Sequence, residues 1–131
     1  MAPLITEALD SAGITSPFPI QEMCLPRALD GQDPIGQAKT GTGKTLGLGV
    51  PLLQRIASDS VAGAIPQALV VVPTRELCVQ VAKDLELAGS RQGTRVLAVY
   101  GGRSYEPQVE ALEAPIAAAG PPPRPHPAPP R

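Results

Sequence analysis

The sequence predicts an α/β fold built around a parallel sheet, and three apolar segments of strand length carry this prediction. These segments are residues 35–38, 68–72 and 96–100. Each leads through turn-forming residues into a helical pattern, at residues 44–58, 75–88 and 105–112. Strands that alternate with helices are typical of parallel sheets with right-handed crossovers. We therefore expect a parallel sheet with flanking helices.

Two further helices are expected before the first strand, at residues 3–12 and 19–29. Pro3 suits a first helical turn, and Gly13 and Gly31 are stop signals. Pro34 cannot donate a ladder hydrogen bond, so the first strand should begin after it. Pro51 should kink the helix at 44–58, because it removes an amide donor.

The composition favours one globular domain. The chain has 131 residues, 43% of them hydrophobic, with a mean hydropathy of +0.04. It has no apolar run long enough to span a bilayer and no pattern of a signal peptide, so we expect a cytoplasmic protein. Cys24 and Cys78 fall in apolar helical patterns without metal-ligand spacing, which predicts reduced, buried packing residues.

Any binding of nucleic acid must rely on a few positioned groups. The net charge of −1 excludes a general attraction to polyanions. The three aromatic residues, Phe18, Tyr100 and Tyr105, are too few for a base-stacking platform. If RNA binds, we expect its backbone to be held.

The composition changes abruptly after Glu113. Residues 114–131 contain eight of the 17 prolines. Because proline at this density is incompatible with helices and central strands, we expect a disordered, extended tail. A PxxP ligand for an SH3-like partner is the alternative interpretation.

The stretch AKTGTGKT, residues 38–45, has the make-up of a phosphate-binding loop. Gly41 and Gly43 allow positive φ angles that turn backbone amides inward, and the helix that follows adds the positive end of its dipole. Lys44 supplies a charge for the β- and γ-phosphates, and the Thr45 hydroxyl suits Mg²⁺. The loop alone leaves the chemistry open among kinases, GTPases, transporters and motor ATPases.

Three flanking motifs narrow this choice. They are GITSPFPIQ (13–21), PTREL (73–77) and the pair Gly101-Gly102. Together with AKTGTGKT, and in their order along the chain, they resemble the Q motif (GITSPFPIQ), motif I (AKTGTGKT), motif Ia (PTREL) and the GG motif (Gly101-Gly102) of the DEAD-box ATP-dependent RNA helicases, especially bacterial members. Gln21 precedes Ala38 by 17 residues, the spacing of the family. The resemblance implies a P-loop NTPase fold of the RecA-like type.

The resemblance also implies residue roles. Gln21 would read the edge of adenine, since its amide offers both a donor and an acceptor. The residues implied to bind ATP are Gln21, Ala38, Lys39, Thr40, Gly41, Thr42, Gly43, Lys44 and Thr45, with Lys44 and Thr45 catalytic and Thr45 on Mg²⁺. The residues implied to hold the RNA sugar-phosphate backbone, independently of sequence, are Pro73, Thr74, Arg75, Gly101 and Gly102.

Two departures from the family concern motifs within and after the resemblance. Phe18 stands where the family often has threonine, and no TPGR, DEAD or SAT motif follows Glu113. Since the missing groups contribute roughly 10³ to 10⁵ in rate, we expect negligible turnover. The expected organisation is an incomplete first RecA-like domain at 1–113 and a tail at 114–131, which we interpret as a frameshifted or misannotated continuation. Two rival interpretations remain, an inactive ATP- or RNA-binding chain and a proline-rich interaction protein.

Overall fold

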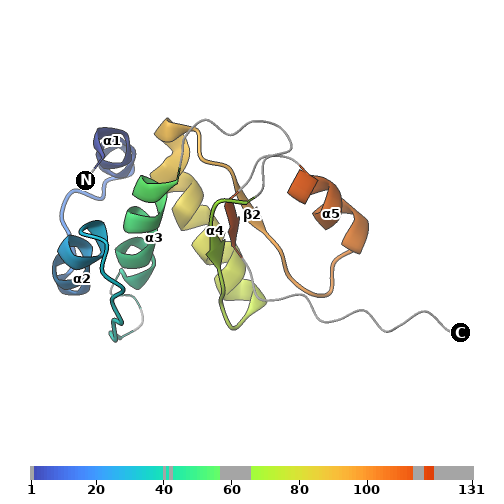
Figure 1. The fold of residues 1–131 in the computed structure, drawn as a ribbon, viewed down its shortest axis with the longest axis horizontal. Helices are drawn as coiled ribbons and strands as arrows, with labels where there is room; N and C mark the ends of the chain where they lie inside the picture. Colours follow the sequence, from blue (N-terminus) through green and yellow to red (C-terminus); the bar gives the residue numbers. More distant parts are fainter. Residues whose placement is uncertain (1, 40, 42, 57–65, 114–116, 120–131) are drawn as a thin grey trace, which may run out of the picture.

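The computed structural model describes residues 2–39, 41, 43–56, 66–113 and 117–119, and it has helices packed beside a small sheet (Figure 1). The helices are α1 (Pro3–Ser11), α2 (Pro19–Leu29), α3 (Lys44–Arg55), α4 (Arg75–Gly89) and α5 (Tyr105–Glu113), with a 3₁₀ turn, η1 (Ser90–Gln92). The strands are β1 (Leu69–Val70), β2 (Val96–Ala98) and β3 (Ala117–Ala119). In Figure 1, α4 lies between α3 and α5.

The described sheet is parallel and has the order β1-β3-β2. Leu69 aligns with Ala118 in one ladder, and Leu97 aligns with Ala118 in the other. The predicted parallel α/β arrangement is therefore confirmed. The expectation of coil from residue 114 onward is wrong for residues 117–119, because their amides and carbonyls complete the ladders of two neighbours. The rest of the expected tail, residues 114–116 and 120–131, lies outside the described residues.

The strand expected at residues 35–38 is absent. Residues 32–39 are irregular, and Ile35 is fully exposed. The segment lies against α2, where a Cβ added to Gly36 would be 3.2 Å from the Cys24 Sγ. A strand requires a partner for its ladder, and none of the described residues pairs with this segment. The apolar run at residues 35–38 is therefore not sufficient to form a strand.

The helices otherwise follow the sequence pattern closely. The helix expected at 19–29 has those bounds, and the helix expected at 44–58 ends at Arg55 and continues through Pro51. Thr74 begins α4 as its N-cap, because its side-chain oxygen accepts a hydrogen bond from the Leu77 amide at 3.2 Å. None of the described helices is long and apolar enough to cross a membrane.

The core forms around one apolar stripe of α4. The stripe contains Cys78, Val81, Leu85 and Ala88, and it packs against α1 and α3. The partners from α1 and α3 are Ile5, Leu9, Val50 and Leu53. Cys78 is buried as expected, whereas Cys24 is only partly buried, and no disulfide joins the two. The prediction of a buried packing role is therefore confirmed for Cys78 and wrong for Cys24.

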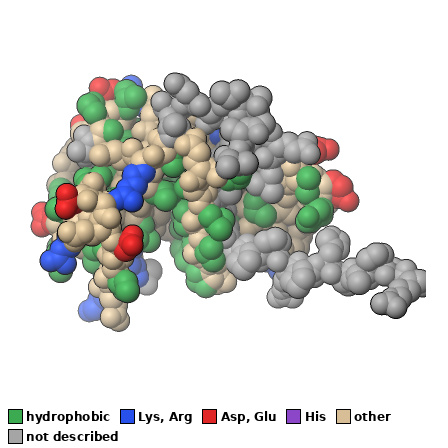
Figure 2. Space-filling model, viewed as in Figure 1, with side chains coloured by type: hydrophobic (Ala, Val, Ile, Leu, Met, Phe, Trp, Pro, Cys, Tyr) green, Lys and Arg blue, Asp and Glu red, His purple; other side chains and the backbone are tan. Residues whose placement is uncertain are grey.

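One side of β1 remains exposed. Leu69 and Val71 are largely accessible to solvent, and Figure 2 shows hydrophobic side chains at the surface over β1 and the segment after it. Val72, by contrast, is buried in the core. The alternation places one face of this segment against the helices and the other toward solvent.

A glycine permits the close packing of α3 on α4. A Cβ added to Gly49 would overlap Leu85 Cδ2, whereas a Cβ added to Gly47 would meet only Gln21 Cγ, at 3.7 Å. The two glycines lie in the same helix, two residues apart. Alanine at either position gains the same helix propensity, but only alanine at Gly49 would clash with Leu85.

We predict that Gly49→Ala destabilises the fold by about 1–3 kcal/mol, because overpacking exceeds the gain in helix propensity. Gly47→Ala is the matched control, and it should be neutral or slightly stabilising. Thermal unfolding followed by circular dichroism measures both. Equal stability of the two variants would contradict the packing of α3 on α4 described here.

Candidate functional site

The glycine-rich loop adopts the backbone that its sequence predicts. Gly41 has φ = +81° and Gly43 has φ = +78°, both in the left-handed region. Gly43 is the N-cap of α3, and its carbonyl accepts the Gly47 amide at 3.1 Å. The loop therefore delivers the chain directly into the amino end of a helix, where amides without helical partners favour an anion.

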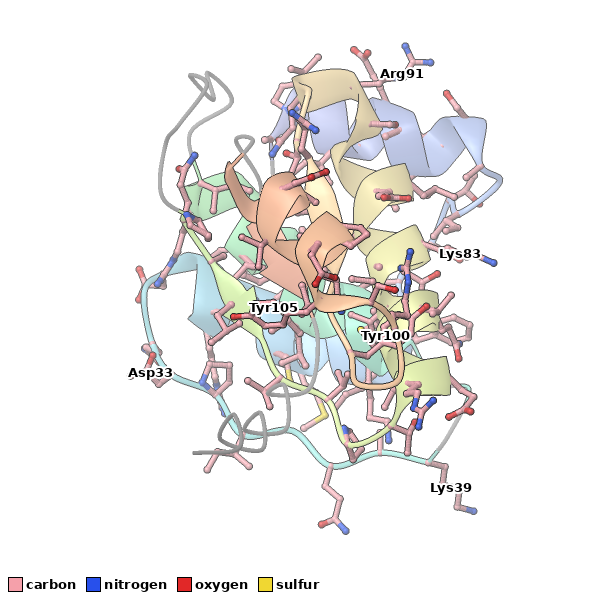
Figure 3. The ribbon with its side chains drawn as sticks, turned by 90° about the vertical axis from the view of Figure 1, so that its right-hand side faces the viewer. Asp33, Lys39, Lys83, Arg91, Tyr100 and Tyr105 are labelled. Atoms are coloured by element: carbon pink, nitrogen blue, oxygen red, sulfur yellow. The ribbon has the colours of Figure 1, made fainter. Side chains whose placement is uncertain are left out.

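Lys44 spans the base of this loop. Its Nζ donates a hydrogen bond to the Ala38 carbonyl at 2.7 Å, and the side chain is exposed. The ammonium group has three donors and uses one of them in this bond. Two donors therefore remain for phosphate oxygens. Lys39, in contrast, projects away from the body of the protein (Figure 3).

Gln21 joins α2 to the end of the loop. Its Oε1 accepts a hydrogen bond from the Phe18 amide at 3.0 Å, and its Nε2 donates to the Gly43 carbonyl at 2.9 Å. The residue is only 5% exposed. An amide carries two donor hydrogens and two acceptor lone pairs, so each atom keeps one position for a ligand. Whether Gln21 reads adenine stays a prediction.

The contact with Gln21 requires glycine at position 43. A Cβ at Gly43 would overlap Gln21 Nε2 and would lie 2.7 Å from Phe18 Cδ2. Gly41 shares the left-handed φ but has open space around it. A side chain at Gly43 would thus disturb both the loop and the start of α2.

A mostly apolar pocket borders Gln21 between α1, α2 and α3. Its lining includes Leu9, Leu25, Leu46 and Val50, with Thr15 and Ser16 as polar members. Such concave apolar surfaces with a few polar groups are typical of small-molecule sites. The pocket therefore adjoins the residue that the sequence assigns to adenine.

Thr45 provides oxygen chemistry suited to Mg²⁺. It is partly buried in the first turn of α3, immediately after Lys44. Mg²⁺ keeps several waters and takes one or two protein ligands together with phosphate oxygens. A single hydroxyl beside the phosphate loop fits this preference. Thr40 and Thr42 lie outside the described residues.

A second group of predicted residues meets at the amino end of α4. Pro73 and Thr74 follow β1, and the Gly101-Gly102 turn follows β2. The carboxyl ends of parallel strands lie at one edge of a sheet. A Cβ added to Gly102 would be only 2.6 Å from an Arg75 guanidinium nitrogen, so Arg75 lies directly over this glycine. The structure therefore brings the two motifs together.

Thr74 has a structural role in this group. Its hydroxyl oxygen accepts the Leu77 amide, so one lone pair is occupied by the helix cap. The amides of Arg75 and Glu76 precede the first intrahelical bond and donate to no other described residue. They remain available to an anion at the start of α4.

Gln108 was missed by the sequence analysis. Its Oε1 accepts the Tyr100 amide at 3.0 Å, and its Nε2 donates to the Ser104 carbonyl at 3.1 Å. A polar residue three and four positions before Ala111 and Leu112, on one helical face, was the available signal. Figure 3 shows Tyr100 on the loop near α5, whereas Arg91 lies in η1, beyond the carboxyl end of α4.

Cys78 is not a reactive group of the site. Burial raises the pKa of its thiol, and the hydrogen bond to the Val99 carbonyl opposes that shift only in part. The thiolate is the nucleophilic form of cysteine, and burial disfavours it. Cys78 therefore serves as packing between α4 and the segment after β2.

Comparison with known proteins identifies the family. The family model for DEAD/DEAH box helicases matches residues 18–123. The chain belongs to the DEAD/DEAH box helicase family. The match includes the phosphate loop, the PTREL segment and the Gly101-Gly102 pair, and it continues beyond Glu113.

Several curated DEAD-box helicases are similar in sequence. The DEAD-box ATP-dependent RNA helicase CshA of Streptococcus pneumoniae is 47% identical over 113 residues, which cover 86% of this chain and 21% of that protein. The ATP-dependent RNA helicase DeaD of Escherichia coli is 45% identical over 109 residues, which cover 82% of this chain and 17% of that protein. The chain thus spans about a fifth of the length of these relatives.

Solved structures of DEAD-box helicases share the fold. A DEAD box protein from Methanococcus jannaschii matches with a TM-score of 0.82 and 29% identity, over 92% of this chain and 32% of that one. The RNA helicase Prp28 from Chaetomium thermophilum bound to ADP matches with a TM-score of 0.81 and 34% identity, over 92% of this chain and 30% of that one.

We predict that Gly43→Ala is more harmful than Gly41→Ala. Both place a side chain at positive φ, at a cost of about 1–2 kcal/mol. Only Gly43→Ala also displaces Gln21, so it should have the larger loss in the free energy of unfolding. Denaturant titration measures the difference. A Gly43→Ala variant as stable as Gly41→Ala would contradict the Gln21 contact.

Proposed function

We propose that this chain forms the ATP-binding site and part of the RNA-binding surface of an ATP-dependent RNA helicase. The observation that carries the proposal is the loop that passes through Gly41 and Gly43 into α3, with Lys44 across its base. Membership of the helicase family supports the same function. The named relatives are ATP-dependent RNA helicases, and their full activity is carried by longer chains.

The ATP phosphates would lie in the loop from Ala38 to Thr45. The amides at the start of α3 and the Lys44 ammonium group would provide positive charge beside the phosphate oxygens in this position. Thr45 would hold Mg²⁺ through its hydroxyl, and the ion would supply positive charge beside the phosphates. In this proposal Lys44 and Thr45 have catalytic roles because they contact the reacting group.

Adenine would lie against Gln21. Oε1 and Nε2 each have one hydrogen-bonding position left after the bonds to Phe18 and Gly43, and adenine offers a matching donor and acceptor. The Gln21 side chain would then contact both the phosphate loop, at Gly43, and the adenine base. This arrangement would favour ATP over GTP, because guanine presents the opposite pattern at that edge.

RNA would lie across the amino end of α4 and the Gly101-Gly102 turn. Arg75 and the open amides of α4 offer donors for a phosphate, and glycine allows close approach of the sugar-phosphate backbone. These groups carry no base-specific pattern. The proposed RNA contact, with Pro73 and Thr74 beside it, is therefore independent of sequence.

A crossed binding experiment tests both parts of the proposal. Purified chain should bind a fluorescent ATP analogue with Mg²⁺ and a labelled single-stranded RNA. Lys44→Ala should weaken ATP about 10–100-fold, since a bond to a charged group contributes about 1.5–3 kcal/mol, and should leave RNA binding unchanged. Arg75→Ala should weaken RNA and leave ATP binding unchanged.

The controls are Lys83→Ala and Arg91→Ala, which remove exposed basic groups elsewhere on α4 and η1. RNA-stimulated phosphate release, measured in parallel, separates turnover from binding. ATP binding that survives Lys44→Ala would refute the assignment of the loop. RNA binding that survives Arg75→Ala but falls in a control variant would refute the assignment of the RNA surface.

A further inference from the structure

The Gly101-Gly102 turn is held in place by a buried glutamine of α5. We infer that Gln108 is a positioning residue for RNA, because it fixes the turn where Gly102 meets Arg75. The inference rests on the RNA contact proposed above and adds a residue to it. Gln108 itself need not touch the RNA.

Gln108 satisfies a backbone group that the sheet leaves open. β2 ends at Ala98, so the Tyr100 amide lies beyond the last ladder residue, and the Gln108 Oε1 accepts it at 3.0 Å. The other end of the same side chain donates to the Ser104 carbonyl at 3.1 Å. The side-chain amide of Gln108 thereby joins the two ends of the segment from Tyr100 to Ser104. Gln108 is only 9% exposed, so water competes weakly for these bonds.

Two cationic side chains lie at the turn, Arg75 from α4 and Arg103 from the turn itself. The Arg75 guanidinium group lies against Gly102, whose φ of +88° only glycine adopts readily. The Arg103 guanidinium carbon lies 5.4 Å from the centre of the Tyr100 ring, within the range of a cation–π contact. Gln108 therefore fixes a turn that has two positive groups at it, and such groups suit a phosphate chain.

Loss of the Gln108 amide has a specific consequence. The partly buried Tyr100 amide would be left without an acceptor, which is costly, and the turn would move to reach water. Movement of Gly102 would change its approach to Arg75. The phosphate loop lies on α3, and Gln108 makes no hydrogen bond to it. The effect should therefore reach RNA binding and spare ATP binding.

The test compares Gln108→Met with Gln80→Met in the full chain. Methionine is close in length to glutamine but cannot form either bond, and Gln80 is an exposed residue of α4. Gln108→Met should weaken binding of labelled single-stranded RNA about tenfold, equally for two RNAs of different sequence, with ATP-analogue affinity unchanged. Gln80→Met should match the wild type in both assays.

A double-mutant cycle with Arg75→Ala separates positioning from general stability. If Gln108 acts through the Gly102–Arg75 contact, Gln108→Met should weaken RNA binding less in the Arg75→Ala background than in the wild type. Full additivity of the two losses would overturn the inference. So would an equal fall in ATP and RNA affinity, since that result indicates a loss of folded protein.

A second variant covers the case in which Gln108→Met does not fold. Gln108→Glu keeps an acceptor for the Tyr100 amide but cannot donate to Ser104, and Gln80→Glu controls for its charge. We expect an RNA affinity between wild type and the Met variant or, if the latter is unfolded, a loss of several-fold relative to Gln80→Glu. Unchanged affinity would overturn the inference while leaving the proposed function intact. A wild-type chain that binds ATP but no RNA would instead overturn the proposed RNA contact and this inference with it.

Discussion

The packing of α4 through its buried stripe is the interaction on which the rest of the structure depends. Cys78, Val81, Leu85 and Ala88 fill the space between α1, α3 and the sheet. The same helix presents Arg75 at its amino end, over Gly102. One rigid element therefore joins the helix of the phosphate loop to the proposed RNA surface. Since Gly49 brings α3 against Leu85, a shift of one helix must be accommodated by the other.

Two glutamines complete the arrangement, one on each side of α4. Gln21 ties the start of α2 to Gly43, and Gln108 ties the segment after β2 to α5. Both are buried, and both satisfy backbone groups that regular structure leaves open. The positive-φ glycines next to them provide space and conformation, and the amides fix that conformation. The combination pre-organises the two turns that we propose as anion sites, in a chain without a net positive charge.

Local sequence signals predicted the helices, the loop and the positions of β1 and β2, and they failed at two segments where pairing with distant residues decides the structure. The helix limits were indicated by Pro3, Gly13 and Gly31. The loop conformation was indicated by Gly41 and Gly43. Proline and glycine give such signals because each determines which φ angles its own backbone can adopt. Residues 35–38 and 117–119 were assigned wrongly, since a strand depends on distant partners that a local pattern does not encode. The bonds of Gln21 to Gly43 and of Gln108 to Tyr100 were missed for the same reason. The domain limits, the origin of the tail and the site roles stay predictions.

The measurement that tests the central claim most directly is an amide chemical-shift map of the ¹⁵N-labelled chain, titrated with ATP–Mg²⁺ and, separately, with single-stranded RNA. The account predicts that ATP shifts Gly41, Gly43 and the side-chain amide of Gln21. RNA should shift Arg75, Glu76, Gly101 and Gly102. An RNA response confined to the phosphate loop, or an ATP response confined to the Gly101-Gly102 turn, would contradict the division of the two sites across α4.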